Sequence, residues 1–107
     1  MDSNKLQEVA FEIILSSGDG RTLIHESFQL MREEKFSEAQ QKLEDANESL
    51  VNAHRAQTGL LQEYANGEKI EMEIIMVHAQ DHLMTTMTLK EVAEEMLVLY
   101  QRQSVNH

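Results

Sequence analysis

The chain has no cysteine, no proline and no tryptophan, and only four glycines among its 107 residues. Without cysteine, disulfides, thiolate metal sites and cysteine nucleophiles are excluded, which fits a reducing cytosol. The lack of proline, together with abundant alanine, leucine, glutamate, glutamine and methionine, favours an all-α protein. No apolar run approaches the roughly 20 residues of a membrane span, and the N-terminus shows no signal-peptide pattern. We therefore expect a soluble, cytoplasmic, all-α protein without direct membrane insertion.

Basic residues are also scarce, with nine Lys and Arg against nineteen Asp and Glu and a formal charge of −10. This balance opposes nucleic-acid binding, in which contacts to phosphate dominate affinity. It suits a protein partner with a basic face, whose approach the acidic surface would steer. Acidity that only keeps the protein soluble is an equally simple explanation.

Apolar residues recur at helical spacing in three segments that are separated by short joints. We expect helices over about residues 3–32, 37–65 and 71–102, within a single domain of residues 1–107. Asn66-Gly67 predict the end of the second helix, because both residue types tolerate a left-handed backbone. Short joints make neighbouring helices antiparallel, so the sequence predicts an antiparallel three-helix bundle.

Two local signals refine this prediction. Gly18 and Gly20 lie in the first segment and lower helix propensity by roughly 1 kcal/mol each relative to alanine. Because the apolar spacing continues beyond them, we favour one continuous helix, in which these small residues permit close approach of another helix. Ser37 and Gln40 match a capping box at the start of the second helix.

The second and third segments differ in their apolar faces. The second carries an alanine-rich face, which predicts close packing: Ala39, Leu43, Ala46, Leu50, Ala53, Gln57, Leu60 and Tyr64. We assign the main stripe of the third to Ile74, Val77, Asp81, Met84/Thr85, Thr88, Val92, Met96 and Leu99. A buried carboxylate inside that stripe must be partnered, protonated or placed at an assembly interface. An exposed stripe edge is the remaining alternative, and apolar residues on more than one face predict oligomerisation.

Three titratable side chains gather in the third segment. His78, Asp81 and His82 stand at positions i, i+3 and i+4, and at about 100° per residue they share one side of a helix. Packing alone gives no reason for this cluster, so we treat it as a candidate reaction centre. The remaining histidines are expected to be surface or packing residues: His25, His54 and His107.

Two chemistries fit this cluster. Paired histidines four residues apart can bind zinc, with Asp81 as a third ligand, although Ala79 stands where metalloproteases carry glutamate. Alternatively, a neutral imidazole of His78 can accept a phosphoryl or acyl group, with His82 or Gln80 donating hydrogen bonds to it. Because no Gly-x₄-Gly-Lys loop is present, phosphate would have to come from another phosphoprotein. A purely structural bundle also stays open.

The segment Val77–Thr85 resembles the active-site signature of the IIA component of the lactose/cellobiose-type phosphoenolpyruvate-dependent sugar phosphotransferase system. The resemblance extends over nearly the whole chain. Further similar segments are Phe11–Ile14, Ser17–Arg21, Ala46–Leu50, Ala53–Thr58 and Leu97–Tyr100. Gly20 departs from the family, in which alanine is more frequent.

This resemblance implies a homotrimer of three-helix subunits. His78 matches the histidine that accepts a phosphoryl group from HPr and passes it to a cysteine of the IIB component, which phosphorylates sugar entering through the IIC membrane channel. His82 and Gln80 belong to the same signature and are assigned support of the phosphorylated state. Asp81 matches an acidic residue at the three-fold axis, where three carboxylates share a metal ion; we expect structural Mg²⁺ there.

The transported sugar is less closely defined, because this component need not touch it. Ala79, where lactose-type members often have glycine, favours a cellobiose-like β-glucoside over lactose-like disaccharides. A noncatalytic helical adaptor or regulator that retains this fold is the alternative function.

Overall fold

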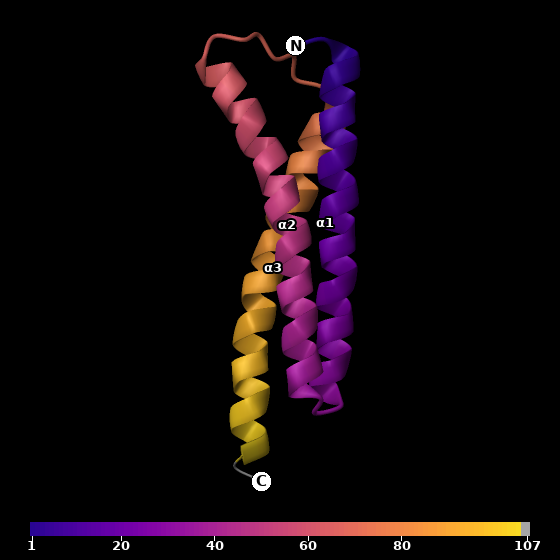
Figure 1. The fold of residues 1–107 in the computed structure, drawn as a ribbon, viewed down its shortest axis with the longest axis vertical. Coiled ribbons are helices and arrows are strands. Elements are labelled where there is room, and N and C mark those ends of the chain that lie inside the picture. The colour runs from indigo at the N-terminus through magenta and orange to yellow at the C-terminus, as the bar shows by residue number, and fades with distance from the viewer. Residues whose placement is uncertain (106–107) are drawn as a thin grey trace.

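The computed structural model describes residues 1–105, so His107 lies outside the described residues. Three helices account for most of this range: α1 (Ser3–Arg32), α2 (Phe36–Ala65) and α3 (Ile74–Val105). They run down, up and down in an elongated bundle of 57 × 20 × 18 Å (Figure 1). Residues 1–105 contain no strand. The prediction of three antiparallel helices is confirmed, and none of these helices is long and apolar enough to cross a membrane.

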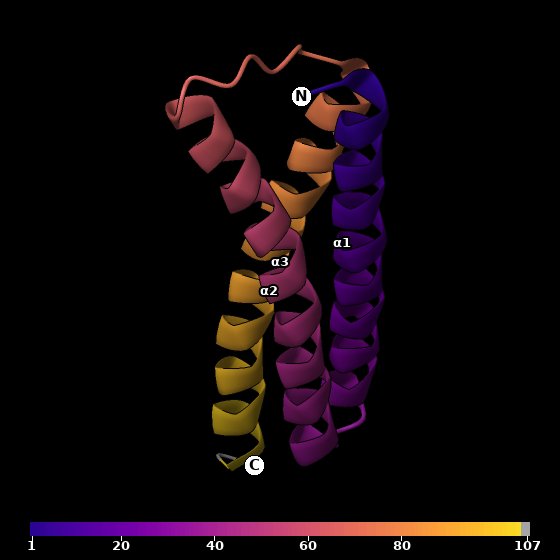
Figure 2. The ribbon, with the colours of Figure 1, turned by 45° about the horizontal axis from the view of Figure 1, so that its top comes forward.

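The three helices do not stay together over their full lengths. The C-terminal end of α2 diverges from α1 in both ribbon views, and residues 66–73 lead back from that end to α3 (Figures 1 and 2). Tyr64 lies in the diverging part and is 67% exposed, so its predicted place on the packed face of α2 is wrong. The other seven positions predicted on the same face of α2 are buried, from Ala39 to Leu60.

The turn between α1 and α2 is closed by the backbone. Glu34 adopts a left-handed φ of 60°, and the N–H of Lys35 donates to the carbonyl of Leu30 over 2.9 Å. The chain is therefore helical again at Phe36, with Lys35 as an N-cap that makes no side-chain hydrogen bond. Because Ser37 already lies inside the helix, its predicted capping box is wrong.

The predicted end of the second helix at Asn66-Gly67 is confirmed, because α2 ends at Ala65. Gly67 has a φ of 94°, as expected for a glycine just beyond a helix end. The following residues extend further than predicted, and α3 begins at Ile74 rather than near residue 71. Ser3 donates to Glu73 over 3.3 Å and thereby links the start of α1 to the residue before α3.

Gly20 is the point of close approach between α1 and α2. A Cβ atom added there would lie 3.1 Å from Cγ of Leu50 and 3.5 Å from the carbonyl oxygen of Ala46. The same test at Gly18 finds nothing within 4 Å. The prediction of close helix packing is therefore confirmed for Gly20 and wrong for Gly18, although both lie inside one continuous helix.

The face that α3 buries is not the stripe predicted from the sequence. Its buried residues are Met76, Ala79, Leu83, Thr86, Ala93 and Leu97. The predicted stripe instead lies largely on the surface, with exposed fractions of 89% for Ile74, 50% for Val92 and 58% for Leu99. Met96 is the exception, since it is half-buried and packs against the core. Both faces of α3 are apolar, and the chain itself covers only one of them.

Candidate functional site

The two histidines singled out in the sequence lie side by side on α3. The rings of His78 and His82 meet edge to face, with their centroids 6.1 Å apart and their planes inclined by 63°. His78 is exposed, whereas His82 is half-buried. The helix spacing of four residues brings them together, so the prediction of a shared face is confirmed. An exposed imidazole therefore has a half-buried imidazole as its neighbour on the same face of α3.

The environment of His82 favours its neutral form. Burial lowers the pKa of His82, and the positive charges of Arg21 and His78 lower it further, while Asp81 opposes them. Within residues 1–105, the Nδ1 atom of His82 is buried and has no hydrogen-bond partner. A buried N–H without an acceptor is costly, so the proton of the neutral ring is better placed on Nε2. In this tautomer Nε2 is a hydrogen-bond donor.

Asp81 lies on the exposed side of α3, in the stripe that the chain leaves uncovered. Its backbone carbonyl accepts a hydrogen bond from Thr85 over 2.9 Å, as is common for helical threonine. Over the described part of the chain, no three His, Asp or Glu side chains are placed to hold a metal ion together. The predicted three-ligand site from His78, Asp81 and His82 is therefore not formed within the single chain.

Gln80 points to the other side of α3, toward α2. Its Oε1 accepts a hydrogen bond from Nε2 of Gln57 over 3.0 Å. Gln57 is only 8% exposed, whereas Gln80 is half-buried at the edge of the bundle. Because residues two apart on a helix project about 200° from one another, Gln80 and His78 of one chain do not converge.

Two residues near this site were missed as candidates in the sequence. Arg21 of α1 is close enough to His82 to lower its pKa, and it forms no ion pair among residues 1–105 despite the acidic surface. Gln57 was assigned only to the packing face of α2. Gln57 is the one polar residue on an otherwise Ala- and Leu-rich buried face of α2, and this could have marked it as a candidate in the sequence. For Arg21, the clue was its place in the Ser17–Arg21 segment.

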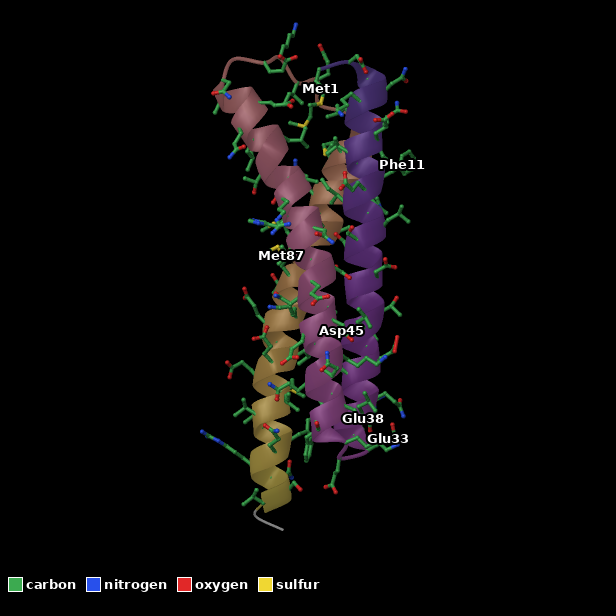
Figure 3. The ribbon with its side chains drawn as sticks, viewed as in Figure 1. Met1, Phe11, Glu33, Glu38, Asp45 and Met87 are labelled. Atoms are coloured by element: carbon green, nitrogen blue, oxygen red, sulfur yellow. The ribbon has the colours of Figure 1, made fainter. Side chains whose placement is uncertain are left out.

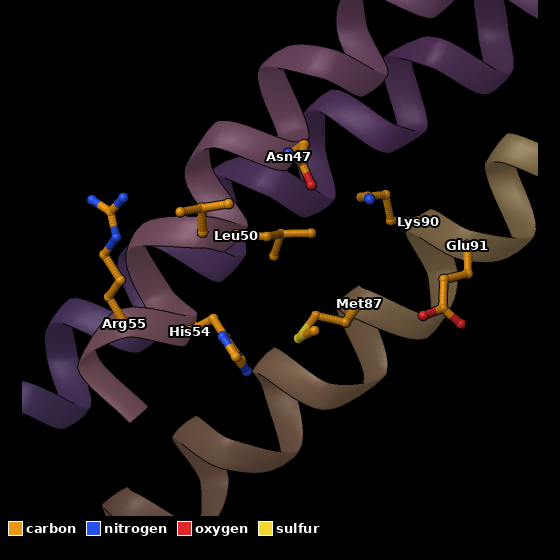
Figure 4. A pocket seen from close by; sticks show the side chains of 8 residues that line it. Asn47, Leu50, His54, Arg55, Met87, Lys90 and Glu91 are labelled. Atoms are coloured by element: carbon orange, nitrogen blue, oxygen red, sulfur yellow. The ribbon is translucent and has the colours of Figure 1, made fainter. Parts of the chain in front are cut away.

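His54 lines a separate pocket of about 320 Å³ between α2 and α3. Figure 4 shows His54 and Met87 extending into this space from the two helices, with Lys90 and Glu91 further along α3. Neither His78 nor His82 is among its lining residues. His54 and His25 are both exposed, as expected for surface histidines. The ring centroids of His25 and Phe28 are 6.3 Å apart.

Sequence comparisons find relatives that match this chain over almost its full length. The lactose-specific EIIA component of the phosphotransferase system (PTS) from Staphylococcus epidermidis is 41% identical over 104 residues, which cover 97% of this chain and 100% of the relative. The lichenan-specific phosphotransferase enzyme IIA component of Bacillus subtilis is 44% identical over 100 residues, covering 94% of this chain and 91% of the relative.

Solved structures show the same fold. PtcA from S. mutans superimposes with a TM-score of 0.94 at 62% identity, covering 94% of this chain and 99% of that one. The IIA(Chitobiose)–HPr complex of the N,N'-diacetylchitobiose branch of the Escherichia coli phosphotransferase system gives a TM-score of 0.80 at 30% identity. That match covers 92% of this chain and 96% of the other.

The helical fold and these relatives define a sugar phosphotransferase-system component of the IIA class. More narrowly, residues 8–101 match the model described as "PTS system, Lactose/Cellobiose specific IIA subunit". The chain belongs to this lactose/cellobiose IIA family, and the resemblance seen in the sequence is confirmed.

Proposed function

We propose that this protein is a phosphohistidine carrier in which His78 accepts a phosphoryl group from HPr and passes it to a cysteine of the IIB component. The IIB component would then phosphorylate sugar that enters through the IIC membrane channel. The observation that carries the proposal is the pairing of exposed His78 with His82, at a ring separation of 6.1 Å. The solved complex of a IIA relative with HPr supports the choice of donor.

The arrangement suits transfer by direct attack on phosphorus. A neutral ring nitrogen of His78 forms an N–P bond as the N–P bond of the donor phosphohistidine breaks. The proton that leaves the other nitrogen of His78 balances the proton that the departing imidazole takes up. The N–P bond to His78 then breaks as the IIB cysteine forms an S–P bond, and the departing imidazole of His78 takes up a proton that balances the one lost by the cysteine thiol. Nε2–H of His82 can donate to a phosphoryl oxygen, and such charge-assisted hydrogen bonds are stronger than neutral ones.

We further propose a homotrimer in which the uncovered stripe of α3 faces the three-fold axis. Ile74, Val77, Met84, Val92 and Leu99 are each between 49% and 89% exposed, although all are apolar. They recur along one side of α3, and a continuous exposed apolar surface commonly marks an interface. Three parallel copies of α3 would cover these side chains in a coiled-coil-like packing.

The same axis would gather Asp81 from three copies. Like charges brought together repel, and a divalent cation offsets that repulsion. We propose that Mg²⁺ is held there by the three Asp81 carboxylates. Bound Mg²⁺ would supply charge neutralisation for assembly, and no step of phosphoryl transfer passes through it.

We propose a cytoplasmic location, which phosphoenolpyruvate as the source of the phosphoryl group requires, and a cellobiose-like or lactose-like disaccharide as the sugar. Names among the relatives include both lactose and lichenan, which supports a saccharide as the transported substrate. Ala79 is buried in the bundle. The choice of a cellobiose-like sugar therefore rests on the residue type at position 79 in the family. It does not rest on any contact between Ala79 and the sugar.

Incubation with phosphoenolpyruvate, enzyme I and HPr, followed by intact mass measurement, tests the carrier function. We expect the wild type to gain about 80 Da, the mass of one phosphoryl group held as phosphohistidine. His78→Ala should gain none while retaining its helical content. His54→Ala is the matched control, because His54 is also exposed but lies in the separate pocket. A folded wild type without the mass gain would favour the noncatalytic adaptor.

A further inference from the structure

Among residues 1–105, Gln57 is one of four buried polar residues; the other three are Ser17, Ser27 and Thr86. Its Nε2 donates to Oε1 of Gln80 over 3.0 Å, across the contact between α2 and α3. Neighbouring positions on the same face of α2 are fully within the core, with Ala53 at 0% and Leu60 at 6% exposure. Gln57 is therefore held in place by packing, and leaving its amide unpaired there would be costly.

This hydrogen bond decides which end of the Gln80 amide is free. A glutamine amide has a carbonyl oxygen that accepts and an NH₂ group that donates. Since Oε1 of Gln80 already accepts from Gln57, its NH₂ group is left for other partners. Gln80 is only half-buried, at the edge of the helix contact, so that group is accessible. The amide consequently presents a donor, which suits an anion.

The position of Gln80 on α3 indicates where such an anion would come from. At about 100° per residue, His78 projects roughly 60° to one side of the exposed stripe, which is centred on Asp81, Val92 and Leu99. Gln80 projects roughly 100° to its other side. When identical helices pack around an axis on that stripe, the flank of one copy meets the opposite flank of the next. His78 of one copy then faces Gln80 of its neighbour.

We propose that Gln57 is a positioning residue that fixes the Gln80 amide with its NH₂ group toward the phosphoryl group on His78 of the neighbouring copy. This inference rests on the proposed carrier function and on its trimer. Gln57 touches neither the phosphoryl group nor His78. It acts by occupying the carbonyl of Gln80, so that an electron-rich oxygen is kept away from the phosphoryl anion.

Gln57→Glu tests the proposal because it reverses the polarity of the hydrogen bond with little change in shape. An ionised carboxylate only accepts, so Gln80 should turn its NH₂ group toward position 57 and its oxygen toward the phosphoryl group. We expect the equilibrium constant for phosphorylation by phospho-HPr to fall about tenfold at pH 8, the loss expected for one hydrogen bond to a charged group. Gln57→Leu removes the bond without reversing it, so the Gln80 amide can adopt either of its two orientations. The equilibrium constant for phosphorylation should then fall only about twofold.

The pH dependence separates positioning from a structural role. Burial at position 57 would raise the pKa of the introduced carboxyl above the ordinary glutamate value. Once protonated, that carboxyl can donate to Gln80 as the native amide does. The gap between Gln57→Glu and the wild type, measured at the same pH, should therefore close as the pH falls toward about 5.5. The proposal would be overturned if the equilibrium constant of Gln57→Glu fell below that of the wild type by the same factor at every pH. It would also be overturned if Gln57→Leu showed the same fall as Gln57→Glu.

A second measurement does not depend on the folding of a variant. Nuclear magnetic resonance of the wild type follows the side-chain NH₂ groups of Gln57 and Gln80 as HPr phosphorylates the protein. We expect the Gln80 NH₂ signal to shift and the Gln57 NH₂ signal to keep its slow exchange. An unchanged Gln80 signal in fully phosphorylated protein would overturn the proposal.

The two hypotheses can fail separately. If the wild type takes up no phosphoryl group, the carrier function fails and the role of Gln57 fails with it. If the wild type is phosphorylated but Gln57→Glu matches it at pH 8, only the positioning role is overturned. Oligomeric state and helical content are compared for each variant, so that a loss of assembly is recognised as such.

Discussion

The ring of His82 meets that of His78 edge to face, one helical turn further along α3, at a centroid distance of 6.1 Å. One ring is exposed and the other is half-buried. The buried Nδ1 of His82 has no partner among the described residues, which leaves Nε2 to carry the proton of the neutral ring. The proposed carrier function assigns the exposed ring the role of the nucleophile and the other ring that of a hydrogen-bond donor.

Removing the donor at position 82 should slow phosphoryl transfer without abolishing it. His82→Leu introduces an apolar side chain of similar bulk and removes Nε2–H. We expect transfer from phospho-HPr to slow by about ten- to a hundredfold, since a hydrogen bond to a charged group contributes roughly 1.5–3 kcal/mol. His82→Gln carries an NH₂ group near the former Nε2 position and should retain most of the rate. Rapid-quench measurement of the phosphorylated fraction checks both, and a wild-type rate in His82→Leu would contradict the assigned role.

Replacing glycine by alanine in α1 should stabilise the bundle to different degrees at two positions. At Gly18 an added methyl group meets nothing within 4 Å, so Gly18→Ala should gain about 1 kcal/mol from helix propensity. At Gly20 the methyl would lie 3.1 Å from Cγ of Leu50. Leu50 lines the pocket between α2 and α3 and has room to shift, so Gly20→Ala should still gain about 0.5 kcal/mol.

Urea unfolding at a fixed protein concentration measures both changes. Gly20→Val adds bulk that Leu50 cannot accommodate, and it should lose about 1–3 kcal/mol through overpacking. A larger gain for Gly20→Ala than for Gly18→Ala would show that the Leu50 contact does not resist an added methyl group.

The sequence predicted best what is contained within a single helix. The His78–His82 pair follows directly from their four-residue spacing. The alanine-rich face of α2 was also predicted correctly up to Leu60, because α2 has one apolar side and that side packs on the other helices. On α3 the same reasoning selected a stripe that the single chain leaves exposed. Periodicity identifies an apolar face but carries no information on whether the same chain or another copy covers it.

Contacts between helices were harder to predict. The Gln57–Gln80 hydrogen bond joins residues 23 apart on two helices, and its geometry depends on their relative rotation. Ser37 and Gln40 have the residue types of a capping box, yet the left-handed Glu34 and the Lys35–Leu30 bond start α2 earlier. Tertiary geometry and turn closure overrode local propensity at both places.

Charging the uncovered stripe of α3 should dissociate the proposed trimer. Val92→Lys would place three ammonium groups at the axis, where burial and mutual repulsion both oppose assembly. Phe11→Lys is the control, because Phe11 is 54% exposed, close to the 50% of Val92, and points away from α2 and α3 in the view of Figure 3. We expect light scattering after size-exclusion chromatography to give monomer mass for Val92→Lys and trimer mass for Phe11→Lys. The opposite pattern would place the interface on α1.

Removing divalent metal should destabilise the wild-type assembly but not an Asp81→Asn variant. In the wild type, chelation would leave three carboxylates facing one another at the axis with no cation to offset their charge, whereas the amides of Asp81→Asn neither repel nor bind Mg²⁺ strongly. Bound at about 100 times its Kd, the metal would contribute roughly 2.7 kcal/mol to stability. Thermal unfolding with Mg²⁺, with chelator and after Mg²⁺ is restored should therefore show a reversible fall in Tm for the wild type alone. An equal fall in both proteins would mean that the metal binds away from Asp81, and the carboxylates would then have to share protons instead.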